Sequence, residues 1–312
     1  MTQHLRAETL KEFAEIQELF PFRSKFVKLP HRMADREIPV TAHYVDEGEG
    51  EVLVFVHGNP TWSFYFRKVI LQLKDRYRCI ALDHIGCGLS EKGMDHRYSL
   101  KDRSLFLEQF LDALEVKQCH LVVHDWGGAI GMAFATRNAA RVRSVTVTNT
   151  AAFPSDWISW RIQLCRLPLI GRWINYHFNG FLRAAMHMTT MQPLDAQVRK
   201  AYLLPYRRKA DRESIDQFVK DIPMRDTHPS YSELKRTGDE LSKFRDSQIL
   251  LLWGMRDFCF APCFLQQWRQ RFPSSKAVEF EDADHFLFEE KAEACAELIA
   301  THVNGNLSGV RP

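Results

Sequence analysis

The chain has 312 residues, enough for one large α/β domain that carries an inserted subdomain. Apolar residues make up 45% of the sequence and charged residues 26%, which is typical of a soluble globular protein with a sizeable core. The formal net charge of +3 and the lack of a basic run argue against a nucleic-acid-binding protein.

The N-terminal stretch from Met1 to Phe20 mixes acidic and basic residues on a helical pattern, unlike a secretory signal. No segment reaches the roughly 18 uncharged apolar residues that a membrane-spanning helix needs. The seven cysteines form an odd, scattered set, which predicts free thiols in a cytoplasmic protein. Cys259 and Cys263 are close in sequence, but no second pair or histidine cluster accompanies them, so no metal site is predicted.

After the N-terminal helix, short apolar runs alternate with amphipathic stretches. In chain order the predicted elements are strand Val52–Val56, helix Trp62–Lys74, strand Arg78–Leu82, helix Ser99–Leu114 with Ser99 as its cap, strand His120–Val123, helix Gly127–Ala140, strands Val142–Val147, Ile249–Trp253 and Ala277–Phe280, and helix Phe288–Val303. Apolar strands separated by helices predict a mostly parallel sheet that is covered on both faces.

The stretch between the fourth and fifth strands is too long for a simple crossover. We therefore predict a core in residues 1–152 and 248–312, and a helical cap in residues 153–247 that lies over the carboxyl ends of the strands. The cap is rich in Trp and Phe and holds sixteen Lys and Arg against eleven Asp and Glu. This excess indicates either a solvated helix surface or attraction toward anionic substrates, lipid or a partner protein.

The main chemical signal is the segment from Val123 to Gly128, which joins a predicted buried strand to a helix. A nucleophile followed by x-Gly at such a junction is lifted above the sheet on a sharp turn. Here the raised residue is Asp125 instead of a serine. Because an aspartate is already ionised at neutral pH, it can displace a leaving group from saturated carbon without a base. The alternative is that Asp125 only caps the helix that follows.

Two further residues complete a triad in the expected chain order of nucleophile, acid and base. Asp257 follows the fifth strand and His285 follows the sixth, so both should converge on Asp125 at the carboxyl edge of the sheet. Asp257 would hold the imidazole in one tautomer, and His285 would activate water against the ester formed on Asp125.

The loop after the first apolar strand, from His57 to Ser63, is expected to supply an oxyanion-hole amide. Asn59 in that loop and Trp126 beside the nucleophile also carry N–H donors that could bind a departing anion such as a halide. Alternatively, Asn59 makes a local turn and Trp126 packs under the cap.

The segments His57–Ser63 and His124–Gly128 together resemble the haloalkane dehalogenases of the α/β-hydrolase superfamily. The resemblance runs from about Phe20 to the closing helix and is weakest in the cap. It implies that Asp125 is the nucleophile, His285 the base and Asp257 the acid, and that Asn59 and Trp126 bind halide. The strand before the cap ends in Thr148-Asn149-Thr150 without the Glu that one subfamily uses, which places the chain nearest the third subfamily.

The third subfamily is also similar to the β-lactone decarboxylases of bacterial olefin synthesis, in which the aspartate attacks a lactone. Dehalogenation of haloalkanes is the leading prediction, with β-lactone decarboxylation as the alternative; neither needs a cofactor. An epoxide hydrolase would need two cap tyrosines, from Tyr176, Tyr202, Tyr206 and Tyr231. A catalytically silent binding protein would be expected to lack part of the triad. The predicted partner is a small apolar halogenated or lactone substrate, and the N-terminal helix could support a homo-oligomer.

Overall fold

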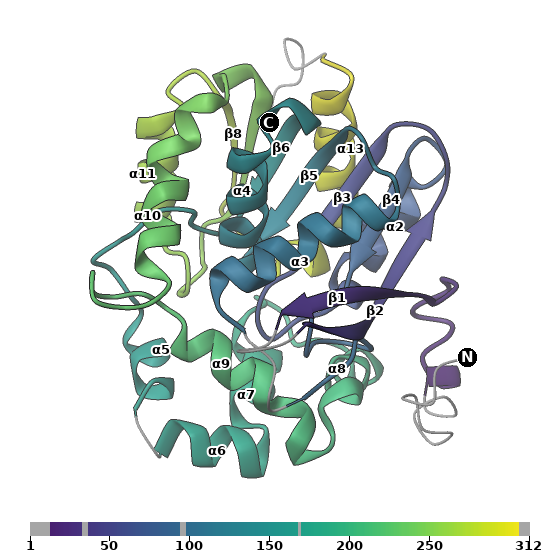
Figure 1. The fold of residues 1–312 in the computed structure, drawn as a ribbon, viewed down its shortest axis with the longest axis vertical. Helices are drawn as coiled ribbons and strands as arrows, with labels where there is room; N and C mark the ends of the chain where they lie inside the picture. Colours follow the sequence, from purple (N-terminus) through teal and green to yellow (C-terminus); the bar gives the residue numbers. More distant parts are fainter. Residues whose placement is uncertain (1–12, 33–36, 94–97, 168–169, 306–312) are drawn as a thin grey trace.

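The computed structural model describes residues 13–32, 37–93, 98–167 and 170–305. An eight-stranded sheet with the order β1-β2-β4-β3-β5-β6-β7-β8 forms its centre (Figure 1). The strands are β1 (Lys25–Arg32), β2 (Glu37–Glu47), β3 (Val52–Val56), β4 (Arg78–Leu82), β5 (Cys119–His124), β6 (Val142–Thr148), β7 (Ile249–Gly254) and β8 (Lys276–Phe280). Strands β3 to β8 run parallel, whereas β2 is antiparallel to both β1 and β4. The predicted α/β-hydrolase sheet is confirmed.

Helices cover both faces of this sheet. The core helices are α2 (Arg67–Leu73), α3 (Leu100–Ala113), α4 (Trp126–Arg137), α11 (Pro262–Arg271), α12 (Leu287–Glu290) and α13 (Ala292–Val303). The helices between β6 and β7 are α5 (Trp160–Cys165), α6 (Ile170–Phe178), α7 (Gly180–Met188), α8 (Ala196–Leu203), α9 (Glu213–Lys220) and α10 (Tyr231–Asp239). Short 3-10 segments are η1 (Ser63–Phe66), η2 (Ala139–Arg141), η3 (Leu204–Tyr206), η4 (Lys209–Arg212), η5 (Glu240–Lys243) and η6 (Asp246–Gln248).

Strand β5 shows why the sheet needs helices on both sides. All six of its residues are buried, and its side chains alternate between the two faces. Leu121 and Val123 belong to the apolar cluster that includes side chains of α3, α4 and α11, whereas Val122 belongs to the cluster that includes side chains of α2 and α13. A strand that is apolar on both faces is stable only between two helical layers.

Several predicted boundaries need correction. The two antiparallel strands β1 and β2 were not predicted, since their mixed sequences lack a continuous apolar run. The helix predicted from Trp62 begins as a 3-10 turn and becomes α-helical only at Arg67. The closing helix predicted from Phe288 to Val303 is interrupted at Lys291, which separates α12 from α13. The predicted cap at Ser99 is confirmed, since its side chain accepts a hydrogen bond from the Asp102 N–H.

The predicted N-terminal helix lies largely outside the described residues, since residues 1–12 are not among them. Its described end does not stand apart from the core. Ile16 and Phe20 are fully buried, and the Phe20 ring packs against Phe22, Trp62 and Phe64. The homo-oligomer was predicted on an amphipathic N-terminal helix that lies outside the core, and this placement is wrong for Ile16 and Phe20.

The strand order reverses between β3 and β5, because the chain passes from β3 out to β4 and then returns to β5 on the other side. Ligands of open α/β sheets bind at such a switch point, beyond the carboxyl ends of the strands. Asn59 follows β3 and Asp125 follows β5, so the fold brings these two distant segments together. The helices α5 to α9 lie at this end of the sheet, whereas α10 lies alongside the sheet and packs on α4 (Figure 1). The division into core and cap domains at residues 153 and 247 stays a prediction.

Within the described ranges, no helix combines the length and the apolar composition that crossing a lipid bilayer requires.

Candidate active site

Asp125 stands on a strained turn between β5 and α4. Its backbone has φ of 52° and ψ of −131°, a conformation that non-glycine residues rarely adopt. The turn is possible because two glycines follow. A Cβ at Gly127 would lie 1.9 Å from the Val56 carbonyl oxygen, and one at Gly128 would lie 1.9 Å from the Thr150 hydroxyl. The Asp125 carboxylate makes no helix-capping hydrogen bond, so the simple capping interpretation is wrong.

The two carboxylate oxygens of Asp125 have different surroundings. Oδ1 accepts a hydrogen bond of 2.6 Å from the backbone N–H of Asn59, and Oδ2 lies 3.6 Å from Nε2 of His285. Burial raises the pKa of Asp125 to about 6, although His285 and the N–H groups of Trp126 and Asn59 act in the opposite direction. Oδ1 is therefore held by a backbone N–H, while Oδ2 faces the His285 imidazole.

His285 is held from several sides. Its Nδ1 lies 2.7 Å from Oδ2 of Asp257, and its backbone carbonyl lies 2.8 Å from Nε2 of His124. The ring of Phe260 stacks on the imidazole at a centroid distance of 5.9 Å. This geometry places Nδ1 toward the acid and Nε2 toward Asp125, so the three predicted triad residues meet in space.

The electrostatics of His285 are set by the two carboxylates. Burial lowers its pKa, but Asp257 and then Asp125 outweigh burial and raise the pKa to about 9. At neutral pH the site therefore holds an imidazolium between two carboxylates. If Asp125 became an ester, one of these negative charges would disappear and the pKa of His285 would fall.

Asn149 is a positioning residue that the sequence analysis did not identify. It follows β6 with a positive φ of 36°, which asparagine tolerates better than most residues. Its side-chain amide donates to Oδ2 of Asp257 at 2.9 Å and to the Gly254 carbonyl at 3.0 Å, and it accepts from the Gly254 N–H at 2.8 Å. The only sequence signal was the Asn at the position where one subfamily has its acid.

The predicted anion-binding pair is only partly arranged for that role. Asn59 and Trp126 both line the cavity above Asp125. The Asn59 side-chain N–H₂ donates to the Ile215 carbonyl at 3.3 Å, while its Oδ1 is buried without a hydrogen-bond partner in the described part of the chain. The Trp126 ring packs against Phe218 at 5.5 Å. The Asn59 NH₂ group carries a second N–H, so binding of a halide does not require the bond to Ile215 to break.

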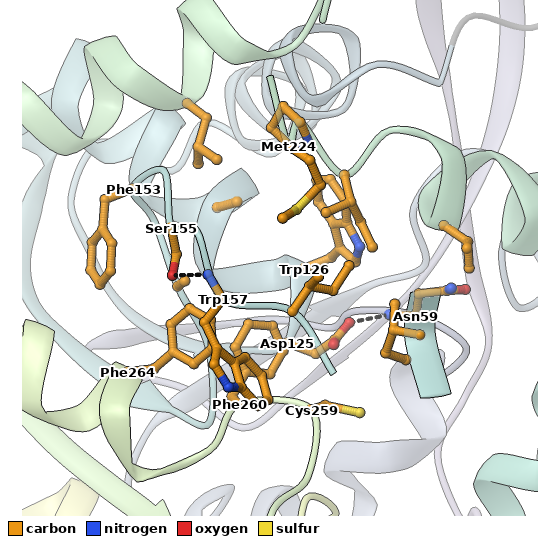
Figure 2. Close-up of a pocket in the computed structure, with 18 of the residues that line it drawn as sticks. Asn59, Asp125, Trp126, Phe153, Ser155, Trp157, Met224, Cys259, Phe260 and Phe264 are labelled. Carbon is orange, nitrogen blue, oxygen red and sulfur yellow. Dashed lines mark hydrogen bonds between the residues drawn. The ribbon is translucent and has the colours of Figure 1, made fainter. Parts of the chain in front are cut away.

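Asp125 lies at the floor of an apolar cavity of about 880 Å³, which includes its open mouth. Figure 2 shows Phe153, Trp157 and Phe264 on one side of the carboxylate and Asn59 on the other. Residues from α9, the loop that follows it and α10 complete the wall, namely Val219, Ile222, Pro223, Met224 and Leu234. This lining suits a small apolar substrate.

The phenols required for an epoxide hydrolase are not arranged for that reaction. None of Tyr176, Tyr202, Tyr206 and Tyr231 is among the described residues that line the cavity. Tyr202 donates to Glu289 at 2.5 Å, and Tyr206 accepts from the Gly88 N–H at 3.0 Å. The geometry does not favour epoxide opening.

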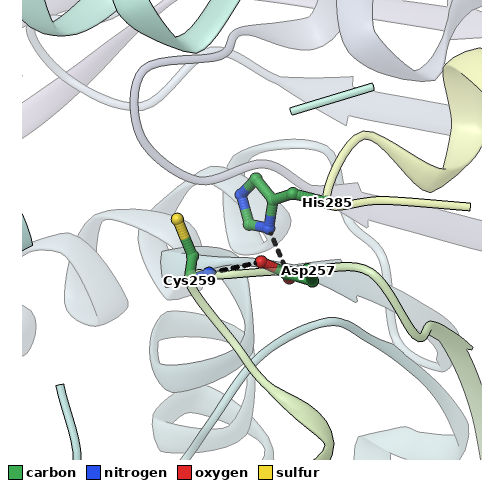
Figure 3. Close-up of side chains that lie close together, drawn as sticks. All are labelled: Asp257, Cys259 and His285. Carbon is green, nitrogen blue, oxygen red and sulfur yellow. Dashed lines mark hydrogen bonds and ion pairs between the residues drawn. The ribbon is translucent and has the colours of Figure 1, made fainter. Parts of the chain in front are cut away.

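Asp257, Cys259 and His285 lie within 4.8 Å of one another and offer three donor types that could hold a metal ion (Figure 3). The carboxylate of Asp257 already accepts hydrogen bonds from the N–H groups of Cys259 and Phe260, at 2.6 and 3.0 Å. Burial and the neighbouring Asp257 charge raise the pKa of Cys259, whereas a metal ligand must be a thiolate. The cluster fits an acid–base pair beside a neutral thiol better than a metal centre.

Comparison with known proteins shows the family of this chain and agrees with its fold. The family model described as the alpha/beta hydrolase fold matches residues 51–292. A cis-3-alkyl-4-alkyloxetan-2-one decarboxylase from Shewanella oneidensis is 40% identical over 271 residues, which cover 84% of this chain and 83% of that protein. Haloalkane dehalogenase 2 from Mycobacterium bovis is 30% identical over 291 residues, with coverages of 92% and 97%. A crystal structure of a haloalkane dehalogenase from Agrobacterium tumefaciens superposes with a TM-score of 0.80 at 26% identity, and the match covers 92% of this chain and 99% of that one.

Proposed function

This chain belongs to the α/β-hydrolase fold family, and we propose that it is an enzyme that decarboxylates β-lactones carrying two alkyl chains, with Asp125 as nucleophile. The observation that carries the proposal is the Asp125 carboxylate, which lies buried at the floor of an apolar cavity between an N–H donor and the His285 imidazole. We further propose that the enzyme acts in the cytoplasm and without a cofactor.

The choice between the two sequence-based hypotheses rests on sequence similarity. Both the decarboxylase and the dehalogenase are relatives, but the decarboxylase shares 40% identity with this chain and the dehalogenase 30%. The Asn59 side chain does not separate the two reactions, because only one of its two N–H donors is engaged with the cap. The difference in identity supports lactone decarboxylation ahead of dehalogenation.

The chemistry can be completed with the residues of this site alone. Oδ2 of Asp125 attacks the ring carbon that carries the lactone oxygen, and that carbon–oxygen bond breaks to give an alkyl ester and a free carboxylate. The bond from the neighbouring carbon to this carboxylate then breaks, and its electron pair forms the double bond. The ester oxygen leaves with its bonding pair, so carbon dioxide and an alkene are released and Asp125 is regenerated.

In this route His285 acts as a cation. Its imidazolium, paired with Asp257, lies 3.6 Å from Oδ2 and would stabilise the carboxylates that form during ring opening and ester departure. The N–H group of Asn59 would hold Oδ1, the oxygen that does not react, and the N–H group of Trp126 would also stabilise the carboxylate. No water is consumed.

Haloalkane hydrolysis is the second candidate, because Asn59 and Trp126 flank Asp125 in the cavity as the halide pair would. Oδ2 would displace halide from carbon, and His285 would then take a proton from water so that hydroxide attacks the ester carbonyl. Loss of the Asp125 charge on ester formation lowers the pKa of His285, which makes the imidazole a base at that stage. This route leaves a water oxygen in the Asp125 carboxylate.

The two routes can be separated with the wild-type protein. It should be given a cis-3,4-dialkyl β-lactone and, separately, 1-bromoalkanes, with alkene and halide release measured. We expect alkene from the lactone, and no label in the Asp125 peptide after lactone turnover in ¹⁸O-water. Halide release without alkene, with ¹⁸O entering that peptide, would overturn the lactone proposal in favour of dehalogenation.

A further inference from the structure

The exposed apolar side chains of this protein are concentrated on two cap helices. Ten large apolar side chains among the described residues are at least 37% exposed, and seven of them lie between Trp157 and Phe178. Those seven are Trp157, Trp160, Leu164, Leu167, Trp173, Ile174 and Phe178. Contiguous exposed apolar surface of this kind marks a site of interaction, because it costs free energy to leave it in water.

Both helices are amphipathic. Helix α6 packs its inner side on α7 and α9 and lies at the edge of the molecule, with α7 and α9 between it and the sheet (Figure 1). Its outer side presents Trp173, at 56% exposure, and Phe178, also at 56%. On α5, Trp160 is 66% exposed and Leu164, one turn later, is 52% exposed. We refer to Trp160, Leu164, Trp173, Ile174 and Phe178 as the outer patch.

The charges around the outer patch have one sign. Residues 157–194 contain four arginines (Arg161, Arg166, Arg172 and Arg183) and no lysine, aspartate or glutamate. Arg161 lies over the Trp160 ring at 5.6 Å, and Lys209, which neighbours His177 of α6 at 3.0 Å, adds a further cation beside the patch. Arg172 is partly offset by Glu213 and Asp216. Trp with arginine at its rim is the composition of a helix that lies in the headgroup region of an anionic bilayer.

The α5 part of the outer patch is separated from the substrate cavity only by α5 and the residues just before it. Ile158 and Ile162 face inward and line the cavity, whereas Trp160 and Leu164 are exposed on the other side. A second, shallower groove shares Ile158 and Met224 with the cavity and continues over Arg166 and Leu167 to the surface. A path therefore leads from the surface beside α5, where Trp160 and Leu164 are exposed, to the cavity that holds Asp125.

We propose that helices α5 and α6 dock on an anionic lipid bilayer and that apolar substrate chains pass from the bilayer along this path into the cavity. The second half rests on the proposed function, since a dialkyl β-lactone dissolves in a bilayer far better than in water. A bilayer fits the combination of aromatic residues, predominantly positive charge and a path into the cavity. A second copy of this chain would bring the same four arginines together and would be repelled.

The test is vesicle flotation of the full-length protein. Vesicles made of phosphatidylcholine and phosphatidylglycerol in equal parts should bind the wild type. Vesicles of pure phosphatidylcholine should bind a smaller fraction of it. The double variant Trp160→Ser, Trp173→Ser should lose binding by more than about tenfold. The matched control is Leu71→Ser with Leu105→Ser, two positions of 37% exposure on α2 and α3, which should float like the wild type.

Three results would overturn the proposal. The first is that the wild type is absent from the floating fraction. The second is that the double Trp variant floats as well as the wild type. The third is self-association of the wild type without lipid, seen by sedimentation velocity and absent in the double variant, which would make the patch a dimer interface. Activity on a short-chain, water-soluble β-lactone shows that the double variant is folded. The Asp125→Asn variant should bind the vesicles as the wild type does. Its turnover therefore tests the proposed function alone, and its flotation tests the docking on the bilayer alone.

Discussion

The protonation of His285 tests the site, because a single substitution, Asp257→Asn, should remove the rise in the pKa of its imidazole. The pKa of His285 is raised from 6.5 to about 9 although burial lowers it, and Asp257 is the largest contributor to the rise. The rise of 2.5 units (9 minus 6.5) corresponds to about 3 kcal/mol in favour of the imidazolium. A neutral amide removes that attraction while burial stays, so we expect the pKa of His285 to fall by at least about 2 units.

The hydrogen bonds around Asp257 also determine what the variant does to the tautomer. The N–H groups of Cys259 and Phe260 both donate to Oδ1, whereas one N–H of Asn149 donates to Oδ2, so the two donors would retain the amide oxygen of the new side chain at the Oδ1 position. Its NH₂ group would then face Nδ1 of His285 and make that nitrogen an acceptor. The imidazole would carry its proton on Nε2 and could not take one from water, so hydrolysis of an ester on Asp125 should slow by about 10³ to 10⁴.

The assay is an NMR titration of ¹³C-labelled histidines, with the His285 signal assigned from its loss in His285→Gln. The same titration on Asp282→Asn is the control, since Asp282 lies in the same loop but is 76% exposed and pairs with Lys291. We expect the His285 titration to move only in Asp257→Asn. A pKa within half a unit of the wild-type value in that variant would refute the proposed role of Asp257.

Three other predictions concern the floor of the cavity. Gly58→Ala should cost about 10² in kcat/KM, because its Cβ would lie 2.0 Å from Oδ1 of Asp125 and displace the nucleophile; a wild-type rate would contradict this placement. Asn149→Ala should lower kcat more than it changes KM. It should also destabilise the fold by about 1–3 kcal/mol, because it leaves buried groups of Gly254 unpaired. An unchanged free energy of unfolding in urea would contradict this role of Asn149. Since Asp125 must be ionised and burial raises its pKa to about 6, kcat/KM should fall about tenfold per pH unit below pH 6 and level off above pH 7; a flat profile down to pH 5 would exclude the raised pKa.

The parts of the fold that follow from apolar periodicity could be predicted from the sequence. Buried strands such as β5 and β7 are continuous apolar runs, and their spacing with helices is typical of a parallel sheet. Strands β1 and β2 were not predicted because their apolar residues alternate irregularly. Their formation depends on antiparallel pairing of β1 with β2 and of β2 with β4, contacts that no local pattern encodes. The burial of Ile16 and Phe20 is likewise a tertiary effect, because it depends on the aromatic residues Phe22, Trp62 and Phe64.

The triad could be predicted because its members follow predicted strands and therefore share one edge of the sheet. Asp125, Asp257 and His285 each stand at such a position, and the structure brings them within hydrogen-bonding or near-contact distance. Asn149 could not be predicted as a partner of Asp257, because its role depends on a positive φ and on the exact approach of the β6 and β7 ends. The direction of the Asn59 side chain depends on the cap carbonyl of Ile215, which is 156 residues away in sequence.

The central claim is that the Asp125 carboxylate is the nucleophile, and turnover by Asp125→Asn tests it most directly. The amide has nearly the same shape and can keep its contact with the Asn59 N–H, but it is neutral and a poor nucleophile. With a cis-3,4-dialkyl β-lactone as substrate, we expect the wild type to release alkene and carbon dioxide and the folded variant to release neither. Alkene formation by Asp125→Asn within tenfold of the wild-type rate, under conditions that exclude deamidation, would contradict the account.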